Sequence, residues 1–212
     1  TNLLSKKYLE KVLGIPVHIY ESVDSTNKLA SARAREITDE RFKGELFVAE
    51  EQTSGKGRRG RTWVSPPFTG IWMSLLIRPD LDGEHIPGVT ILSALSVVKA
   101  VREYAASNDI AGIDARIKWP NDVVINSKKV CGILSELVVS PETNKTDNIT
   151  NYVVSGIGIN VNMEGFEGDE CKYATSLLLE SGAKWNRNIL IGSIIGNLTK
   201  YIEDYEKEGN LG

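Results

Sequence analysis

Apolar residues recur every three or four positions in several stretches of the chain, and this spacing predicts helices that bury one face. Gly14 and Pro16 end the first of these stretches, and Ser25 is a candidate N-cap for an alanine-rich one. The strongest helical pattern begins just after Pro87 and Gly88. Helices are therefore expected at residues 3–13, 25–37, 89–106, 174–180 and 188–206.

Shorter runs rich in β-branched and aromatic residues predict strands between these helices. They lie at residues 17–21, 45–50, 71–77, 113–118, 123–125, 129–139 and 152–161. Residues 141–150 are the least apolar stretch and are expected to form an exposed hairpin loop. Helices before, between and after a mixed, mostly antiparallel sheet indicate an α+β fold, with residues 1–212 forming a single domain.

Composition and charge remove several classes of protein from consideration. The 212 residues are 41% hydrophobic and 25% charged, with a formal net charge of −3, which is ordinary globular composition. No apolar run approaches the roughly 20 residues of a membrane span, and the charge argues against a protein devoted to nucleic acid. Two cysteines and two histidines argue against a disulfide scaffold, a zinc finger and a metalloprotease, and favour a reducing cytoplasm.

A basic, glycine-rich segment at residues 55–60 reads GKGRRG and formally matches G-x-G-x-x-G. A dinucleotide site needs a helix directly after it, but Pro66 and Pro67 leave no room for one. Glycines allow close backbone approach, and guanidinium groups bind phosphate or carboxylate. A small-anion site, a solvated basic turn and a nucleic-acid patch all remain open, and nearby Trp63 favours a ligand that stacks on an indole.

Two further stretches carry polar side chains with weaker signals. Residues 118–122 read KWPND, and Lys129 stands just before an apolar strand. Taken alone, Asp122 fits a turn and Lys129 fits a solvated strand edge. Residues 24–27 read DSTN, which a helix cap explains, although three hydrogen-bonding side chains in a row exceed what a cap needs.

Taken together, these stretches resemble the biotin protein ligases, the biotin–[acetyl-CoA-carboxylase] ligases. Five motifs occur in the family's order between residues 25 and 162. They are STN at 25–27, EQTSGKGRRGRTWVSP at 51–66, KWPND at 118–122, KVCGILSE at 129–136 and GIGINVN at 156–162. The resemblance implies the class II synthetase-like fold shared by biotin and lipoate ligases.

The same resemblance implies a two-step reaction. Biotin and Mg-ATP would give biotinyl-5′-AMP and pyrophosphate, and the acyl group would pass to a lysine of a biotin carboxyl carrier domain. Biotin, ATP and Mg²⁺ would be substrates or co-substrates, with no tightly bound cofactor. An acyl adenylate needs no protein nucleophile, which agrees with the lack of a recognisable Ser-His or Cys-His arrangement.

The resemblance also implies roles for individual residues. Biotin contacts are expected from Ser25, Thr26, Asn27, Gln52, Gly57, Arg58, Lys129 and Gly132. Contacts to ATP or the adenylate are expected from Gly55, Lys56, Gly57, Arg58, Trp63, Lys129 and Asn160. The expected catalytic residues are Lys129, which would bridge the biotin carboxylate and the α-phosphate, Arg58, and Asp122, which would orient or deprotonate the acceptor lysine. The ligands of any metal remain unknown.

The chain departs from the family at one site residue and in its domains. Lys56 stands where members commonly have Arg, which keeps the charge but loses the planar fork. Neither an N-terminal DNA-binding domain nor a full C-terminal β-barrel cap is expected within these 212 residues. The alternatives are a lipoate ligase of the same fold and the effector-binding part of a biotin-responsive repressor; a homodimer paired through a sheet edge in residues 113–161 is also possible.

Overall fold

A computed structural model describes residues 3–39, 41–81, 84–141, 149–168 and 172–208. Within them, seven strands form one sheet in the order β1-β2-β3-β7-β6-β5-β4. The strands are β1 (Val17–Val23), β2 (Glu45–Gln52), β3 (Gly70–Ile77), β4 (Arg116–Lys118), β5 (Asp122–Ile125), β6 (Lys128–Pro141) and β7 (Ile149–Asn160). The helices are α1 (Lys6–Leu13), α2 (Thr26–Ala34), α3 (Ile86–Ser107), α4 (Leu177–Ser181) and α5 (Arg187–Glu208).

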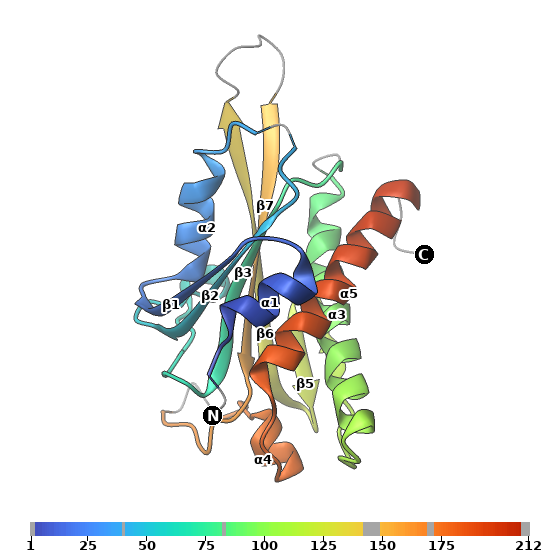
Figure 1. The fold of residues 1–212 in the computed structure, drawn as a ribbon. Coiled ribbons are helices and arrows are strands. Elements are labelled where there is room, and N and C mark those ends of the chain that lie inside the picture. The colour runs from blue at the N-terminus through green and yellow to red at the C-terminus, as the bar shows by residue number, and fades with distance from the viewer. Residues whose placement is uncertain (1–2, 40, 82–83, 142–148, 169–171, 209–212) are drawn as a thin grey trace.

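The sheet has helices on both faces (Figure 1). Helices α1, α3 and α5 pack together over one face and enclose the larger apolar core, whereas α2 lies on the other face over a smaller one. Only β1 and β2 pair in parallel, and the other described neighbours are antiparallel. The predicted mixed, mostly antiparallel α+β fold is therefore confirmed.

Helix boundaries follow the predicted signals at the first helix but not at the second. Gly14 ends α1 in the left-handed conformation, at φ 67°, and its N–H donates to the Glu10 carbonyl. Ser25 does occupy the N-cap position of α2, but its side chain makes no capping hydrogen bond. The prediction that this helix reaches Ile37 is wrong, because α2 ends at Ala34.

The remaining elements match the predictions with shifted ends. The strand expected from residue 113 begins at Arg116, and the short helix expected at 174–180 is Leu177–Ser181. The predicted loop at 141–150 is shorter than expected, since the backbone ladder pairs Pro141 with Ile149. Residues 142–148 of that loop lie outside the described residues.

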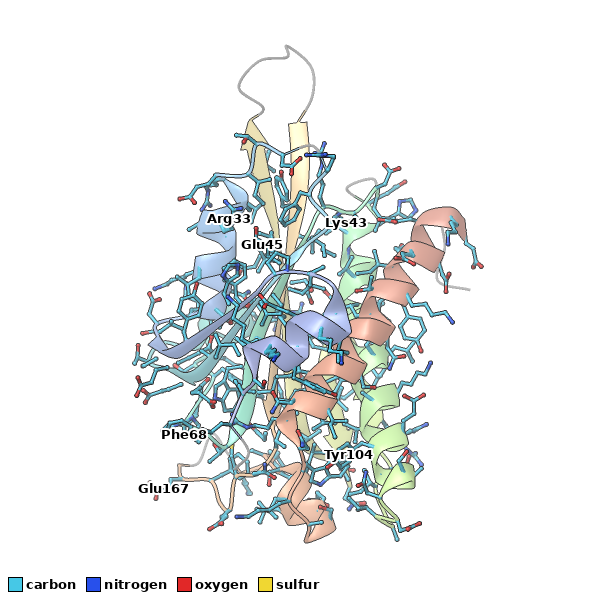
Figure 2. The ribbon with its side chains drawn as sticks, viewed as in Figure 1. Arg33, Lys43, Glu45, Phe68, Tyr104 and Glu167 are labelled. Carbon is cyan, nitrogen blue, oxygen red and sulfur yellow. The ribbon has the colours of Figure 1, made fainter. Side chains whose placement is uncertain are left out.

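Ion pairs connect the helices to the sheet beneath them. Arg33 on α2 lies 2.9 Å from Glu45, through Nη2 and Oε1, at the start of β2 (Figure 2). On the opposite face, the guanidinium of Arg187 lies 2.5 Å from the Glu50 carboxylate, and Arg187 is 1% exposed. These contacts hold β2 between the two helix layers. No helix in the described part of the chain combines the length and apolarity that a membrane crossing requires.

Candidate active site

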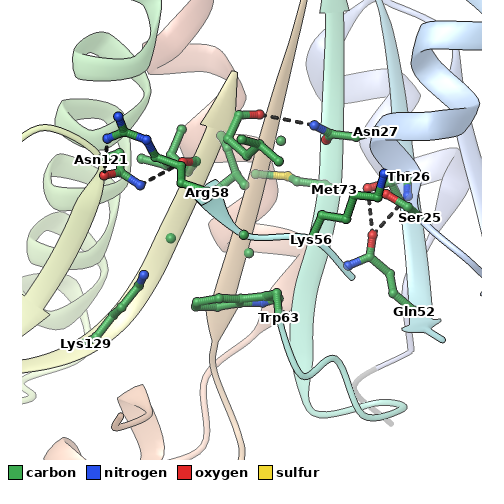
Figure 3. Close-up of a pocket in the computed structure, with 17 residues that line it drawn as sticks. Ser25, Thr26, Asn27, Gln52, Lys56, Arg58, Trp63, Met73, Asn121 and Lys129 are labelled. Atoms are coloured by element: carbon green, nitrogen blue, oxygen red, sulfur yellow. Dashed lines mark hydrogen bonds between the residues drawn. The ribbon is translucent and has the colours of Figure 1, made fainter. Parts of the chain in front are cut away.

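The candidate site is a pocket on the face of the sheet that α2 covers (Figure 3). Its floor is set by strand register, because alternate side chains of a strand share a face. Gly156 and Leu134, which line the pocket, share one row across β7 and β6 with the buried Ser74 of β3. Gly158 and Gly132 line it from the next row, which they share with the buried Trp72 of β3. The pocket holds about 480 Å³ of empty space, counting its open mouth.

Hydrogen-bonding side chains form one end of the pocket. The backbone N–H of Thr26 donates to Gln52 Oε1 at 2.9 Å, and Gln52 Nε2 donates to Ser65 Oγ at 3.0 Å. Asn27 Nδ2 donates to the Leu134 carbonyl at 3.2 Å and to Glu136 Oε2 at 2.6 Å. Ser25, Thr26 and Asn27 are all buried, so this end presents polar groups that are already oriented by the protein.

Positive charge lies toward the other end. Arg58 Nη1 donates to Asn121 Oδ1 at 2.9 Å, and Asn121 in turn donates to the Ile133 carbonyl. Lys129 Nζ lies 2.7 Å from Asp122 Oδ1 and 5.1 Å from the centre of the Trp63 ring. Figure 3 shows Arg58 and Lys129 on the side opposite Ser25 and Asn27, with Met73 between them. The pocket therefore runs from an end rich in hydrogen-bonding side chains, with Lys56 beside them, to an end formed by Arg58 and Lys129.

The glycine-rich segment folds as a tight hairpin above this pocket. The N–H of Gly57 donates to the Arg61 carbonyl at 2.7 Å, and that of Trp63 donates to the Gly55 carbonyl at 2.9 Å. Gly55 must lack a side chain, because a Cβ there would lie 2.4 Å from the Trp63 carbonyl. Residues 61–69, all described, form no helix, so the exclusion of a dinucleotide fold is confirmed.

Trp63 lies against the glycines of the floor. A Cβ on Gly158 would lie 2.4 Å from Trp63 Nε1, and a Cβ on Gly132 would lie 2.9 Å from Cζ3. The indole also meets Trp72 edge to face, with ring centroids 6.5 Å apart. Trp63 thus provides a half-buried aromatic surface beside the cations of the pocket.

Ten of the predicted site residues line the pocket: Ser25, Thr26, Asn27, Gln52, Lys56, Gly57, Arg58, Trp63, Lys129 and Gly132. Lys56 lies beside Ser25 at the polar end and not with Arg58 (Figure 3). Gly55, Asp122 and Asn160 are not among the lining residues. Asp122 reaches the site through its ion pair with Lys129, whereas the buried Asn160 donates its side-chain N–H to the Thr175 carbonyl.

Several lining residues were not predicted from the sequence. They are Met73, Asn121, Ile133, Leu134, Gly156, Ile157 and Gly158. All of them except Met73 lie within the quoted motifs, so their place in those motifs was the available signal. Met73 reads as an ordinary core residue of an apolar strand, and no local pattern marks it.

Nucleophilic catalysis by a cysteine finds no support among the described residues. Cys131 is free and buried, and burial raises the pKa of its thiol far above the ordinary value. No group of three or more His, Cys, Asp or Glu in the described part of the chain is arranged to hold a metal ion. The pocket instead offers charge, hydrogen bonds and shape, which suit alignment of two ligands.

A pocket with hydrogen-bonding side chains at one end, Arg58 and Lys129 at the other and an aromatic surface beside them suits an elongated ligand with a polar head and an anionic end. The model of the biotin/lipoate A/B protein ligase family matches residues 19–160. The chain belongs to this family.

Individual relatives agree with that assignment. The bifunctional ligase/repressor BirA of Bacillus subtilis is 38% identical over 201 residues, covering 94% of this chain and 57% of that protein. The biotin–[acetyl-CoA-carboxylase] ligase of Mycobacterium tuberculosis is 32% identical, covering 82% and 59%.

Among solved structures, the biotin protein ligase from Aquifex aeolicus in complex with biotin and ATP superimposes with a TM-score of 0.71 at 29% identity, covering 91% of this chain and 72% of that one. The Leishmania major enzyme in complex with biotinyl-5-AMP gives 0.68 at 26%, covering 89% and 75%. The predicted biotin protein ligase fold is thus confirmed.

Proposed function

We propose that this chain activates biotin with ATP and then transfers the biotinyl group to a lysine of a biotin carboxyl carrier domain. In the first step a biotin carboxylate oxygen attacks the α-phosphorus of ATP, and the bond to the bridging oxygen breaks to release pyrophosphate. In the second step the uncharged lysine amine attacks the acyl carbon, AMP leaves, and the amine loses a proton. Mg²⁺ enters with ATP as a co-substrate.

The observation that carries this proposal is the order of chemistry along the pocket. Biotin has a ring urea at one end and a carboxylate at the other, separated by apolar carbon. Ser25, Thr26, Asn27 and Gln52 suit the urea, and Lys129 with Arg58 suits the carboxylate and phosphate. Because most of this polar end is buried, a ligand without matching groups would leave hydrogen bonds unmade.

Lys129 has the central catalytic role in this proposal. Its ammonium group lies beside both Trp63 and the Asp122 carboxylate, so an anion entering the pocket competes with Asp122 for the same charge. Once the adenylate displaces it, the Asp122 carboxylate is released from its ion pair and becomes available to orient or deprotonate the acceptor lysine. Arg58 supplies the second positive charge for the phosphate oxygens.

Fewer contacts support the nucleotide end of the site than the biotin end. Trp63 offers the surface against which adenine would stack, while Gly55, Lys56 and Gly57 belong to the loop over the pocket. Asn160 stays a predicted adenine contact, although its amide is engaged with Thr175 in the described arrangement. We also predict cytoplasmic localisation and a homodimer that pairs through an edge strand such as β4.

A lipoate ligase is the alternative from the same family. Its substrate carries a dithiolane ring without hydrogen-bond donors, which would leave the polar end at Thr26 and Asn27 unmatched. The second alternative is a repressor that uses the same pocket to bind the adenylate as a signal. This alternative predicts salt-dependent DNA binding in addition to adenylate formation.

The experiment is to incubate the chain with Mg-ATP and biotin, lipoate or octanoate, and to identify the adenylates by mass spectrometry. We expect biotinyl-AMP alone, followed by a mass increase of one biotinyl group on an added carrier domain. A lipoyl or octanoyl adenylate in its place would overturn the assignment to biotin, and no adenylate would overturn the proposed activity.

A further inference from the structure

A fully buried serine lies directly behind the polar end of the pocket. Ser74 on β3 is 0% exposed and is not among the residues that line the pocket. Its hydroxyl oxygen lies 2.7 Å from Thr26 Oγ1 and 2.6 Å from Asn27 Oδ1. Ser74 therefore touches two side chains that face the ligand without facing the ligand itself.

Counting donors and acceptors fixes the hydrogens in this cluster. The Asn27 nitrogen lies next to the Leu134 carbonyl and the Glu136 carboxylate, which accept hydrogen bonds. The Asn27 oxygen therefore faces Ser74, and the serine hydroxyl must donate to it. The same serine hydroxyl also donates to Thr26 Oγ1 at 2.7 Å, so its one hydrogen is shared between the Thr26 and Asn27 oxygens.

This arrangement gives the Thr26 hydroxyl a defined polarity. Its oxygen accepts from Ser74 and its hydrogen is donated to Gln52 Oε1 at 3.2 Å, which leaves the second lone pair of the oxygen for a ligand. The same Gln52 oxygen accepts the Thr26 backbone N–H, so both donors of Thr26 are directed to one partner. We propose that Ser74 is a positioning residue that makes Thr26 a hydrogen-bond acceptor and holds Asn27 in place, so that the pocket selects an acyl substrate with an N–H donor on its ring.

The inference rests on the proposed function and adds the residue that sets its selectivity. Without the serine hydroxyl, the Thr26 oxygen loses a buried donor and its side chain is free to rotate. The Thr26 hydrogen can then leave Gln52 and turn into the pocket, where two donors, this hydroxyl and the urea N–H, would face each other. Asn27 would also lose the partner of its buried oxygen. We expect affinity for biotin to fall about tenfold, the effect of one well-placed hydrogen bond. Contacts at Lys129 and Trp63 do not involve this cluster.

The test compares Ser74→Ala with Ser155→Ala. Ser155 is also fully buried, lies on the adjacent strand β7, and contacts the Ser93 hydroxyl at 2.8 Å, away from the pocket. Steady-state rates of adenylate formation give kcat and the KM of each substrate. We expect Ser74→Ala to raise the KM for biotin and for desthiobiotin, which keeps the ring urea, by the same factor, with kcat and the KM for ATP within twofold of wild type.

A KM for biotin that is unchanged in Ser74→Ala would overturn the inference, as would a KM for ATP that rises by the same factor as the KM for biotin. Calorimetric titration with biotin distinguishes a failure of the role given to Ser74 from a failure of the proposed function. Binding by wild type with equal binding by Ser74→Ala would overturn the role of Ser74 alone, whereas no binding by wild type would overturn the proposed function and this role with it.

Discussion

Replacing Gly158 with alanine should damage the nucleotide end of the pocket and leave the biotin end intact. The backbone accepts this change, because Gly158 is not among the glycines with positive φ. The new Cβ, however, would lie 2.4 Å from Trp63 Nε1 and 2.7 Å from Cε2. Since ordinary contacts are 3.5–4.0 Å, the indole must move about 1 Å off the sheet.

Overpacking of this kind costs about 1–3 kcal/mol in a folded core. A loss of the same size in the free energy of ATP binding, through the displaced indole, would lower affinity about 5- to 150-fold. We therefore expect Gly158→Ala to raise the KM for ATP by a factor in that range while the KM for biotin stays within about twofold. Pyrophosphate release at varied ATP and at varied biotin measures both values, and the thermal midpoint shows that the variant is folded.

Gly156→Ala is the matched variant, two residues earlier on the same face of β7. Its Cβ would lie 2.1 Å from Asn27 Oδ1, so it should raise the KM for biotin and spare ATP. A wild-type KM for ATP in Gly158→Ala, or the same substrate affected by both variants, would refute the division of the pocket into two ends.

Three further perturbations test the charges in the fold and the site. Lys129→Met should slow adenylate formation about 10²- to 10³-fold with little change in thermal midpoint, since that side chain is 35% exposed; normal rates would remove its catalytic role. Glu50→Gln should cost about 3–5 kcal/mol by removing the carboxylate that faces the buried Arg187, and a thermal midpoint lowered by roughly 10 °C would report it. Burial raises the pKa of Glu45, but hydrogen bonding and charge from Arg33 outweigh it and leave that pKa below its ordinary value. The Glu45 carboxylate therefore stabilises the fold above its unfolded-state pKa, and this stabilisation is lost as the pH falls through its folded-state pKa. The urea midpoint should drop more in wild type than in Glu45→Gln when the pH is lowered from 6 to 3.

The elements could be predicted from the sequence because their signals are local. Gly14 marks the end of α1 by its left-handed conformation, and the periodic apolar residues of α3 and α5 predict helices whatever packs against them. The end of α2 was missed because no glycine or proline follows Ala34 to mark it. A helix end without such a residue depends on the packing of the next segment.

The site could be predicted in its residues but not in its geometry. The order of motifs pointed to Lys129 and Asp122, yet their 2.7 Å ion pair depends on the pairing of β5 with β6. Likewise, Gly132 and Gly158 become the floor beneath Trp63 only through the register of β6 and β7. Ser74 gave no signal, because a lone serine in an apolar strand reads as a core residue until its neighbours across the sheet are known.

The most direct test of the account is exchange of labelled pyrophosphate into ATP, which reports reversible adenylate formation at the pocket. We predict exchange that requires both biotin and Mg²⁺, that lipoate does not support, and that Lys129→Met lowers at least 100-fold. Exchange driven by lipoate, or no exchange by a folded wild-type chain that binds biotin, would contradict the claim that this pocket activates biotin by adenylation.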